Sequence, residues 1–315
     1  MNGPLLRGPV LWLTGQRWFR ALATERGLGR RVAGRFVPGT TLDDAMRAAR
    51  ELDQAGIATM LDYLGENVTS PEQASAAADA YVLALKRIHE AEDLNANISV
   101  KLTQVGLDLA YELCMENAER VMTAASEGDT LVMIDMESSE YVDPTLRAHR
   151  DLKERYPRVG LALQSCLRRT AVDVHGLPKE SIVRLVKGAY LEPPDVAYQT
   201  RGEVDGNWAR LFATLISGGH TVHVATHDDR LVEGVTAFME RCEVPWARAE
   251  FQFLYGIRRD LQQRLAGANH PVRVYVPYGT EWYPYLTRRM AERPANVWFF
   301  LSNLIRFRGA RGVRG

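Results

Sequence analysis

Polar and ionisable side chains recur at the ends of short apolar runs in this sequence. Lys101, Gln164 and Lys187 each follow such a run. Other groups in equivalent positions are Asp135 with Glu137, Gly188, Thr226 with His227, Gln252, and Tyr275. If the runs are parallel strands of a barrel, their carboxyl ends meet at one mouth. We therefore expect these side chains to form a polar ring around a site for a small charged molecule.

The segment RLVKGAY (184–190) carries two cations and a glycine. In a strand, Arg184 and Lys187 would point to opposite faces. Gly188 would let a ligand approach the backbone closely, and the two cations suit an anionic group. The plain alternative is a strand with a lysine that reaches solvent and a turn glycine.

A second segment combines aromatic, basic and acidic groups. Pro284 can open a helix. The side chains that would share one face of this helix are Tyr285, Arg288, Arg289 and Glu292. Guanidinium groups offer a bidentate fork to a carboxylate, so this face suits a small carboxylate with an apolar body. Alternatively, Arg289 and Glu292 form only a surface ion pair.

These groups need a scaffold of alternating strands and helices. Eight apolar runs are expected to be strands, at 57–63, 98–100, 131–136, 159–163, 182–186, 221–225, 249–253 and 272–276. Helical patterns fill the gaps, and others begin after the N-cap candidates Thr41 and Ser70. Continuous apolar strands predict a parallel sheet covered by helices, an α/β fold. Eight such units favour a (βα)8 TIM barrel over an open doubly wound sheet. We expect an N-terminal helical segment at 1–56 and the barrel domain at 57–315.

The composition excludes several classes of protein. Of 315 residues, 46% are apolar and 25% charged, which argues against disorder. The 39 Lys and Arg residues balance 39 Asp and Glu residues, so no nucleic-acid partner is expected. Cys114, Cys166 and Cys242 form no C-x-x-C pair, which suits a reducing compartment. No run reaches the roughly 18 apolar residues that span a bilayer, so we expect a cytoplasmic protein.

Three histidines lie close together in the sequence and could be metal ligands, but their spacing argues against a shared site. His220 and His223 would point to opposite faces of a strand, and His223 and His227 would lie about 13 Å apart in extended chain. One ion cannot bind such a set without a bend in the strand, so we expect no metal site.

At RLVKGAY and YLTRR (285–289), the chain resembles the proline dehydrogenase family in its bacterial monofunctional form. The supporting blocks are ISVKLTQ (98–104), IDME (134–137), LQSCLRRT (163–170), VATHD (224–228), EFQFLYG (250–256) and YVPYG (275–279). The likeness covers about residues 57–303. RLVKGAY and YLTRR occur in the order found in the family, each on the expected type of element, and this pair is a specific signature.

The resemblance implies a distorted (βα)8 barrel that holds FAD, a nucleotide cofactor, in its mouth. It also implies oxidation of L-proline to Δ1-pyrroline-5-carboxylate, the first step of proline degradation to glutamate. Electrons would pass to a membrane quinone. A separate pyrroline-5-carboxylate dehydrogenase would take up the product.

The resemblance also implies roles for individual residues. Arg288 and Arg289, helped by Lys101, would bind the substrate carboxylate, and Tyr285 would wall the ring. The catalytic set would be Asp135, Arg184, Tyr190 and Tyr275. The flavin would lie against Met136, Gln164, Arg184, Val186, Lys187, Gly188, Ala189, Thr226, His227 and Gln252.

Two other functions stay open from the residues alone. One is a flavin barrel that reduces a folate, and the other is a non-catalytic barrel that binds proline or flavin. A peripheral membrane contact is a further expectation. After Glu292 the chain carries five arginines and no acidic residue, and arginines near anionic lipid each contribute about 1 kcal/mol. The plain alternative is a final helix with a basic tail.

Overall fold

The fold is a closed barrel of eight parallel strands in sequence order, each paired with the next and β8 paired with β1. The computed structural model describes residues 34–65, 68–91 and 93–292. The strands are β1 (Ala58–Tyr63), β2 (Ala96–Val100), β3 (Val132–Ile134), β4 (Val159–Gln164), β5 (Ile182–Val186), β6 (Thr221–Ala225), β7 (Ala249–Leu254) and β8 (Val272–Tyr278). The predicted α/β class and the (βα)8 architecture are confirmed.

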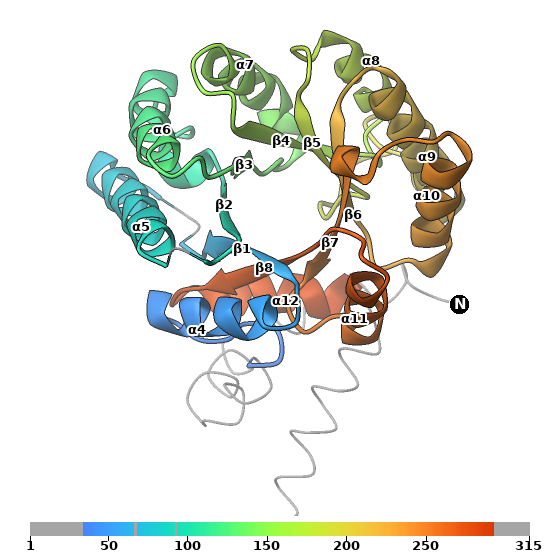
Figure 1. Cartoon of the computed structure of the whole chain (residues 1–315). Helices are drawn as coiled ribbons and strands as arrows, with labels where there is room; N and C mark the ends of the chain where they lie inside the picture. Colours follow the sequence, from blue (N-terminus) through green and yellow to red (C-terminus); the bar gives the residue numbers. More distant parts are fainter. Residues whose placement is uncertain (1–33, 66–67, 92, 293–315) are drawn as a thin grey trace, which may run out of the picture.

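Helices surround the ring of strands (Figure 1). They are α4 (Leu42–Asp53), α5 (Pro71–His89), α6 (Tyr111–Ser126), α7 (Val142–Lys153), α8 (Thr170–Asp173), α9 (Arg201–Ser217), α10 (Asp229–Arg241), α11 (Arg259–Gly267) and α12 (Trp282–Glu292). Strand side chains that face outward pack under these helices in one large apolar core. At one such contact, the indole of Trp208 on α9 donates to the Leu185 carbonyl on β5 at 3.2 Å.

The helix starts follow capping chemistry that the sequence predicts. The Thr41 hydroxyl accepts from the backbone of Asp44, whose carboxylate accepts in return from the Thr41 backbone. Ser70 accepts from the Gln73 backbone, and Pro71 is the first residue of α5. Each cap satisfies an amide that would otherwise lack a partner at the helix start.

Several predicted boundaries were wrong. Strand β3 ends at Ile134 rather than at residue 136. Strand β8 continues to Tyr278, whose carbonyl still accepts from Leu64 at 2.7 Å. Helix α12 starts at Trp282, so Pro284 lies inside its first turn, where a missing N–H costs little.

The seam between the first and last strands closes the barrel. Residues Ala58 to Tyr63 pair in register with Arg273 to Tyr278. The Arg273 guanidinium also donates to the Thr59 carbonyl at 2.8 Å. Helix α4 packs against the outside of this seam. The expected division after residue 56 falls between α4 and β1 and stays a prediction, and residues 1–33 of the N-terminal segment lie outside the described ranges.

Candidate active site

The carboxylate of Asp135, just beyond β3, is the centre of a hydrogen-bonded cluster inside the barrel. Ser99 donates to its Oδ1 at 2.8 Å, and the Tyr275 hydroxyl donates to its Oδ2 at 2.9 Å. The Lys101 ammonium lies 3.4 Å from Oδ2, and the Arg184 guanidinium forms an ion pair with Oδ1. Four side chains, from β2 and the residue that follows it, β5 and β8, therefore converge on one acid.

The charges around Asp135 fix its protonation state. Burial would raise the pKa of this carboxyl, but Arg184 and Lys101 outweigh it, so the pKa lies below its usual range. Burial, followed by the negative charge of Asp135, holds the pKa of the Tyr275 phenol well above its usual value. Asp135 is thus an acceptor and Tyr275 a donor throughout the neutral pH range.

A second acid, Asp62 on β1, also pairs with Lys101. Its Oδ1 lies 3.2 Å from the Lys101 ammonium, and its side chain is fully buried. The sequence analysis did not identify Asp62, because it lies within the apolar run that forms β1. The available signal was an acidic residue inside an otherwise apolar strand, which is costly unless it is paired.

The Arg184 guanidinium is 4% exposed and crosses the barrel interior. Its Nε donates to Gln252 Oε1 on β7 at 2.8 Å, and its Nη1 donates to Ser99 on β2 at 3.1 Å. The guanidinium carbon lies 5.3 Å from the centre of the Tyr275 ring. Partners on three other strands leave this side chain little freedom, so it is preorganised.

Beyond β5, Gly188 packs closely against the side chains of Cys166 and Gln164. Its φ of 115° is in the left-handed region, which favours glycine. A Cβ at this position would lie 2.2 Å from Cys166 Sγ and 3.2 Å from Gln164 Oε1. Gln164 is itself fixed, because its amide donates to the Glu137 carbonyl at 2.7 Å. Any side chain larger than hydrogen would therefore disturb this part of the mouth.

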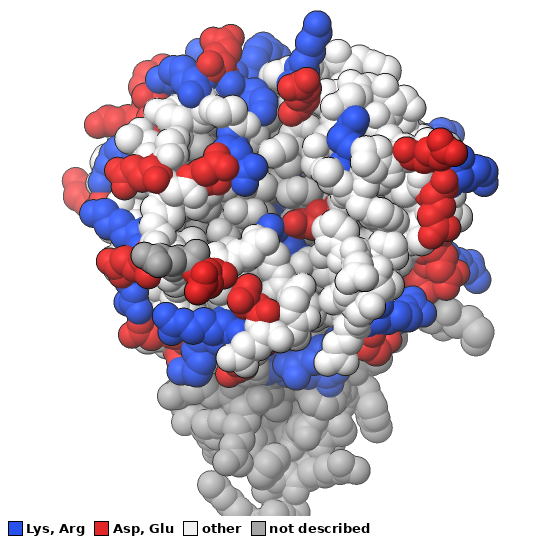
Figure 2. All heavy atoms as spheres, in the orientation of Figure 1, with Lys and Arg blue, Asp and Glu red and all other residues white. Residues whose placement is uncertain are grey.

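The barrel also has a visible central hollow. Figure 2 shows basic and acidic atoms together at the bottom of this hollow, within a rim made mostly of uncharged residues. Charged groups in a hollow of low polarity interact more strongly than the same groups in water. The arrangement suits recognition of a small molecule that is itself charged.

Comparisons with known proteins identify the family. The family model described as "Proline dehydrogenase" matches residues 45–301. The chain belongs to the proline dehydrogenase family. A proline dehydrogenase of Deinococcus radiodurans is 38% identical over 312 residues, which cover 97% of this chain and all of that protein. Proline dehydrogenase 1 of Bacillus subtilis is 35% identical over 303 residues, 96% of this chain and all of that protein.

Solved structures share the fold at lower identity. Proline utilization A from Bdellovibrio bacteriovorus, inactivated by N-propargylglycine, aligns with a TM-score of 0.78 and 20% identity. The match covers 90% of this chain and 38% of that longer one. The corresponding protein of Bradyrhizobium japonicum aligns with a TM-score of 0.68 over 82% of this chain and 30% of its own length.

Within this proline dehydrogenase family member, most predicted site residues lie near the carboxyl ends of the strands. The buried ones are Lys101, Met136, Gln164, Arg184, Thr226, Gln252 and Tyr285. The half-buried ones are Asp135, Val186, Lys187, Gly188, Ala189, Tyr190, His227 and Tyr275. Arg288 and Arg289 fall in α12, which follows β8 at the mouth. Their assigned roles stay predictions.

The two cations of RLVKGAY have different partners, since Arg184 pairs with Asp135 whereas Lys187 pairs with two other acids. The Lys187 ammonium lies 2.5 Å from Asp205 and 2.9 Å from Asp228, at the side of the barrel where α9 and α10 begin. Burial would raise the pKa of Asp228, but bonds from Lys187 and Arg201 outweigh it and lower the pKa to about 2. The opposite facing of the two cations, which the strand period implies, is what separates them.

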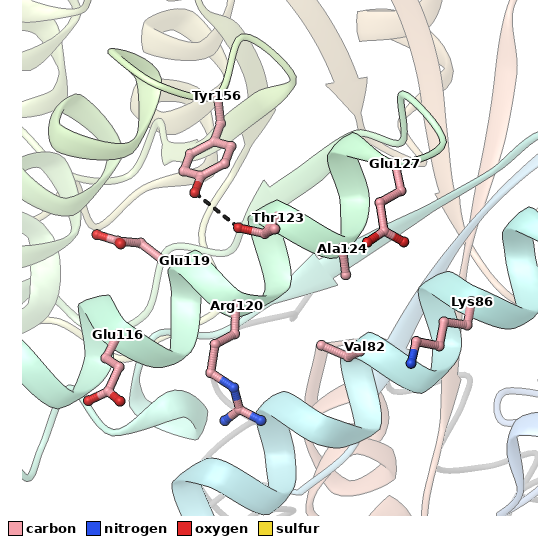
Figure 3. A pocket seen from close by; sticks show the side chains of 9 residues that line it. All are labelled: Val82, Lys86, Glu116, Glu119, Arg120, Thr123, Ala124, Glu127 and Tyr156. Carbon is pink, nitrogen blue, oxygen red and sulfur yellow. Dashed lines mark hydrogen bonds between the residues drawn. The ribbon is translucent and has the colours of Figure 1, made fainter.

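A groove on the outer surface lies apart from this cluster. It runs between α5 and α6, next to Tyr156, whose hydroxyl is 3.2 Å from that of Thr123 (Figure 3). Arg120, on its wall, is already paired with Asp79. The described residues contain no group of three or more His, Cys, Asp or Glu side chains that could hold a metal ion. Across the same ranges, no helix has the length and apolar character needed to cross a membrane.

Proposed function

We propose that this protein oxidises L-proline to Δ1-pyrroline-5-carboxylate with FAD as its cofactor and passes the electrons to a quinone. The observation that carries the proposal is the cluster of Lys101, Asp135, Arg184 and Tyr275 at the barrel mouth of a proline dehydrogenase family member. The reaction would begin proline degradation, and a separate dehydrogenase would oxidise the product further toward glutamate.

The mouth fits a flavin on two observations. Gln164, at the carboxyl end of β4, is fixed by the bond from its amide to the Glu137 carbonyl and presents a preorganised polar group at the mouth. The Arg184 guanidinium supplies a fixed positive charge and donors close by. Residues proposed to hold the cofactor are Met136, Gln164, Arg184, Val186, Lys187, Gly188, Ala189, Thr226, His227 and Gln252. The bound flavin supplies the two-electron acceptor, which no protein side chain can replace.

The chain's own residues would bind and orient the substrate. We propose that Arg288 and Arg289 form charge-assisted bonds to the proline carboxylate and that Lys101 adds a third positive charge. Tyr275 and Tyr285 would wall the five-membered ring. Holding the carboxylate and ring at fixed points turns the reaction into an intramolecular step, in which positioning lowers the barrier.

Lys101 suits anion binding better than base catalysis. Its ammonium lies 3.2 Å from Asp62 and 3.4 Å from Asp135, so its donors are already bonded to carboxylates. The amine proton of proline would therefore leave to solvent, while Asp135 keeps Arg184 and Lys101 in place. Tyr190, half-buried beyond β5, would line the same space.

Delivery of electrons to a quinone dissolved in the membrane would place the enzyme in the cytoplasm at the inner face of that membrane. The arginine-rich segment proposed to contact anionic lipid starts at residue 293 and lies outside the described residues. Its role rests on charge alone and is tested by vesicle binding at low and high salt.

An anaerobic titration tests the proposed function. The purified protein should be yellow with flavin absorbance, and L-proline should bleach it with release of one pyrroline-5-carboxylate per flavin. Flavin absorbance that proline leaves unchanged would support the non-catalytic barrel instead. Bleaching by NAD(P)H and reoxidation by a folate, with no bleaching by proline, would support the folate reductase. Either result would contradict the proposal.

A further inference from the structure

A chain of buried polar groups connects the lower part of the barrel to Arg184. Gln252 on β7 accepts from Arg184 Nε at 2.8 Å, and its amide nitrogen lies 2.8 Å from His223 Nδ1 and 2.9 Å from Glu250 Oε1. Glu250 in turn accepts from Arg273 Nε at 2.9 Å. None of Glu250, His223 and Arg273 was identified as a site residue from the sequence, and the proposed reaction does not use them.

The chemistry of the donors fixes the orientation of the Gln252 amide. A guanidinium has donors only, so the amide oxygen must face Arg184. The amide nitrogen then needs acceptors on its other side, and these are the Glu250 carboxylate and His223 Nδ1. If those acceptors were absent, the amide could turn its nitrogen toward Arg184, where two donors would oppose each other.

Both acceptors are held in the required form. Burial lowers the pKa of His223 to about 4, so its ring is neutral and Nδ1 can accept. Burial would raise the pKa of Glu250, but His223 and Arg273 outweigh it and lower the pKa to about 2, so the group is a carboxylate. Strand pairing aligns His223 with Glu250 and Gln252 with Arg273, which places these groups on neighbouring strands.

We propose that Glu250 is a positioning residue for Arg184: with His223 it holds the Gln252 amide so that the amide oxygen fixes the guanidinium at the flavin. The inference rests on the proposed function, since it concerns the group that would stabilise negative charge on the reduced flavin. Glu250 itself reaches neither proline nor cofactor in this arrangement, so its effect is transmitted through two side chains.

The test compares flavin reduction potentials and spectra of matched variants. The double variant Glu250→Met/Arg273→Met removes both partners of the ion pair, which spares the fold an unpaired buried charge. We expect the reduced flavin to lose about tenfold in relative stability, a potential about 30 mV more negative for a two-electron couple. The flavin should bleach more slowly with proline, while KM changes little.

Arg273→Lys is the control for a merely structural role. It keeps the Glu250 carboxylate and a positive partner but removes the donors to Thr59 and Asn95. We expect it to lower the melting temperature and leave the potential unchanged. A shift in potential equal to that of the double variant would overturn the proposal, because loss of barrel stability alone would then explain the effect.

Two further arms decide the case if the double variant does not fold. His223→Leu removes the other acceptor and should shift the potential in the same direction, whereas His223→Asn retains an acceptor and should restore it. In an Arg184→Met background, neither change should shift the potential further. Unchanged potentials in His223→Leu and in any folded double variant would refute the proposal. Equal shifts in the Arg184→Met background would refute it as well. A wild-type protein that binds no flavin would instead refute the proposed function.

Discussion

The Tyr275 hydroxyl on β8 donates to Asp135 Oδ2, beyond β3, across the interior of the barrel at 2.9 Å. The two strands are not neighbours in the ring, so this bond spans the barrel rather than following a sheet ladder. The bond therefore links the residue after β3 to the last strand of the barrel. The same carboxylate also holds Arg184 and Lys101.

Loss of this bond should slow proline oxidation. Tyr275→Phe removes one donor to Asp135, and we expect a fall in kcat/KM of about tenfold, typical of a hydrogen bond to a charged group. Asp135→Asn should cost more, because Arg184 then loses its counter-ion. The assay uses steady-state kinetics with a soluble dye, with Tyr278→Phe as a buried control that bears no bond to Asp135. Full activity in Asp135→Asn would contradict the assignment.

Substrate anchoring is tested on α12. Arg288→Met and Arg289→Met should each raise the proline KM strongly while flavin stays bound, because each removes a charge-assisted fork to the carboxylate. The expected loss is about 2–4 kcal/mol. Arg210→Met, at an exposed position of α9, is the matched control and should leave KM unchanged. Wild-type KM values in both α12 variants would remove this helix face from the site.

Asp62 should contribute to stability as well as to the site. Asp62→Leu removes the carboxylate that lies 3.2 Å from the buried Lys101 ammonium, and we expect the free energy of unfolding to fall by about 2 kcal/mol. Asp43→Asn disrupts an ion pair with Arg87 whose acid is 74% exposed, so its effect should stay within about 0.5 kcal/mol. Urea unfolding measures both, and equal effects would show that burial of the pair is not what matters.

The pH dependence of stability should trace in part to His149 on α7. Neither ring nitrogen has a hydrogen-bond partner among the described residues, and burial, then Lys153 and Arg150, lowers the pKa to about 4. The unfolded histidine binds a proton below about pH 6.5, but the folded one does so only near pH 4. Acid therefore favours unfolding across this window, by up to about 1.4 kcal/mol per pH unit.

His149→Leu should remove that share of the pH dependence. Urea unfolding of both proteins should show that the free energy of unfolding of the variant, relative to wild type, is more favourable at pH 5 than at pH 8. The slope contributed by His223, whose pKa is also lowered to about 4, should remain in the variant. An identical difference between the two proteins at both pH values would contradict the account.

The strands could be predicted because each is a short apolar run that the helices and the barrel interior bury. The same reasoning did not identify Asp62, Glu250 and Arg273 as interior polar groups, because it assumes that the interior face of a strand is apolar. Here much of the interior is a network of paired charges. Strand period gave the facing of Arg184 and Lys187, but it could not show that Asp205 and Asp228 lie beside Lys187. That pairing depends on where α9 and α10 begin in space.

The seam between β1 and β8 has a consequence for how the protein folds. The bond from Arg273 to the Thr59 carbonyl joins positions 214 residues apart, and contacts of such long range form late and slowly. Until β8 is in place, Asp135 lacks Tyr275 and Glu250 lacks Arg273. A nascent chain that ends before β8 therefore exposes both an unpaired strand edge and charged side chains that the closed barrel buries. Such a chain is prone to aggregation during synthesis. Ring closure and assembly of the proline site are the same folding event.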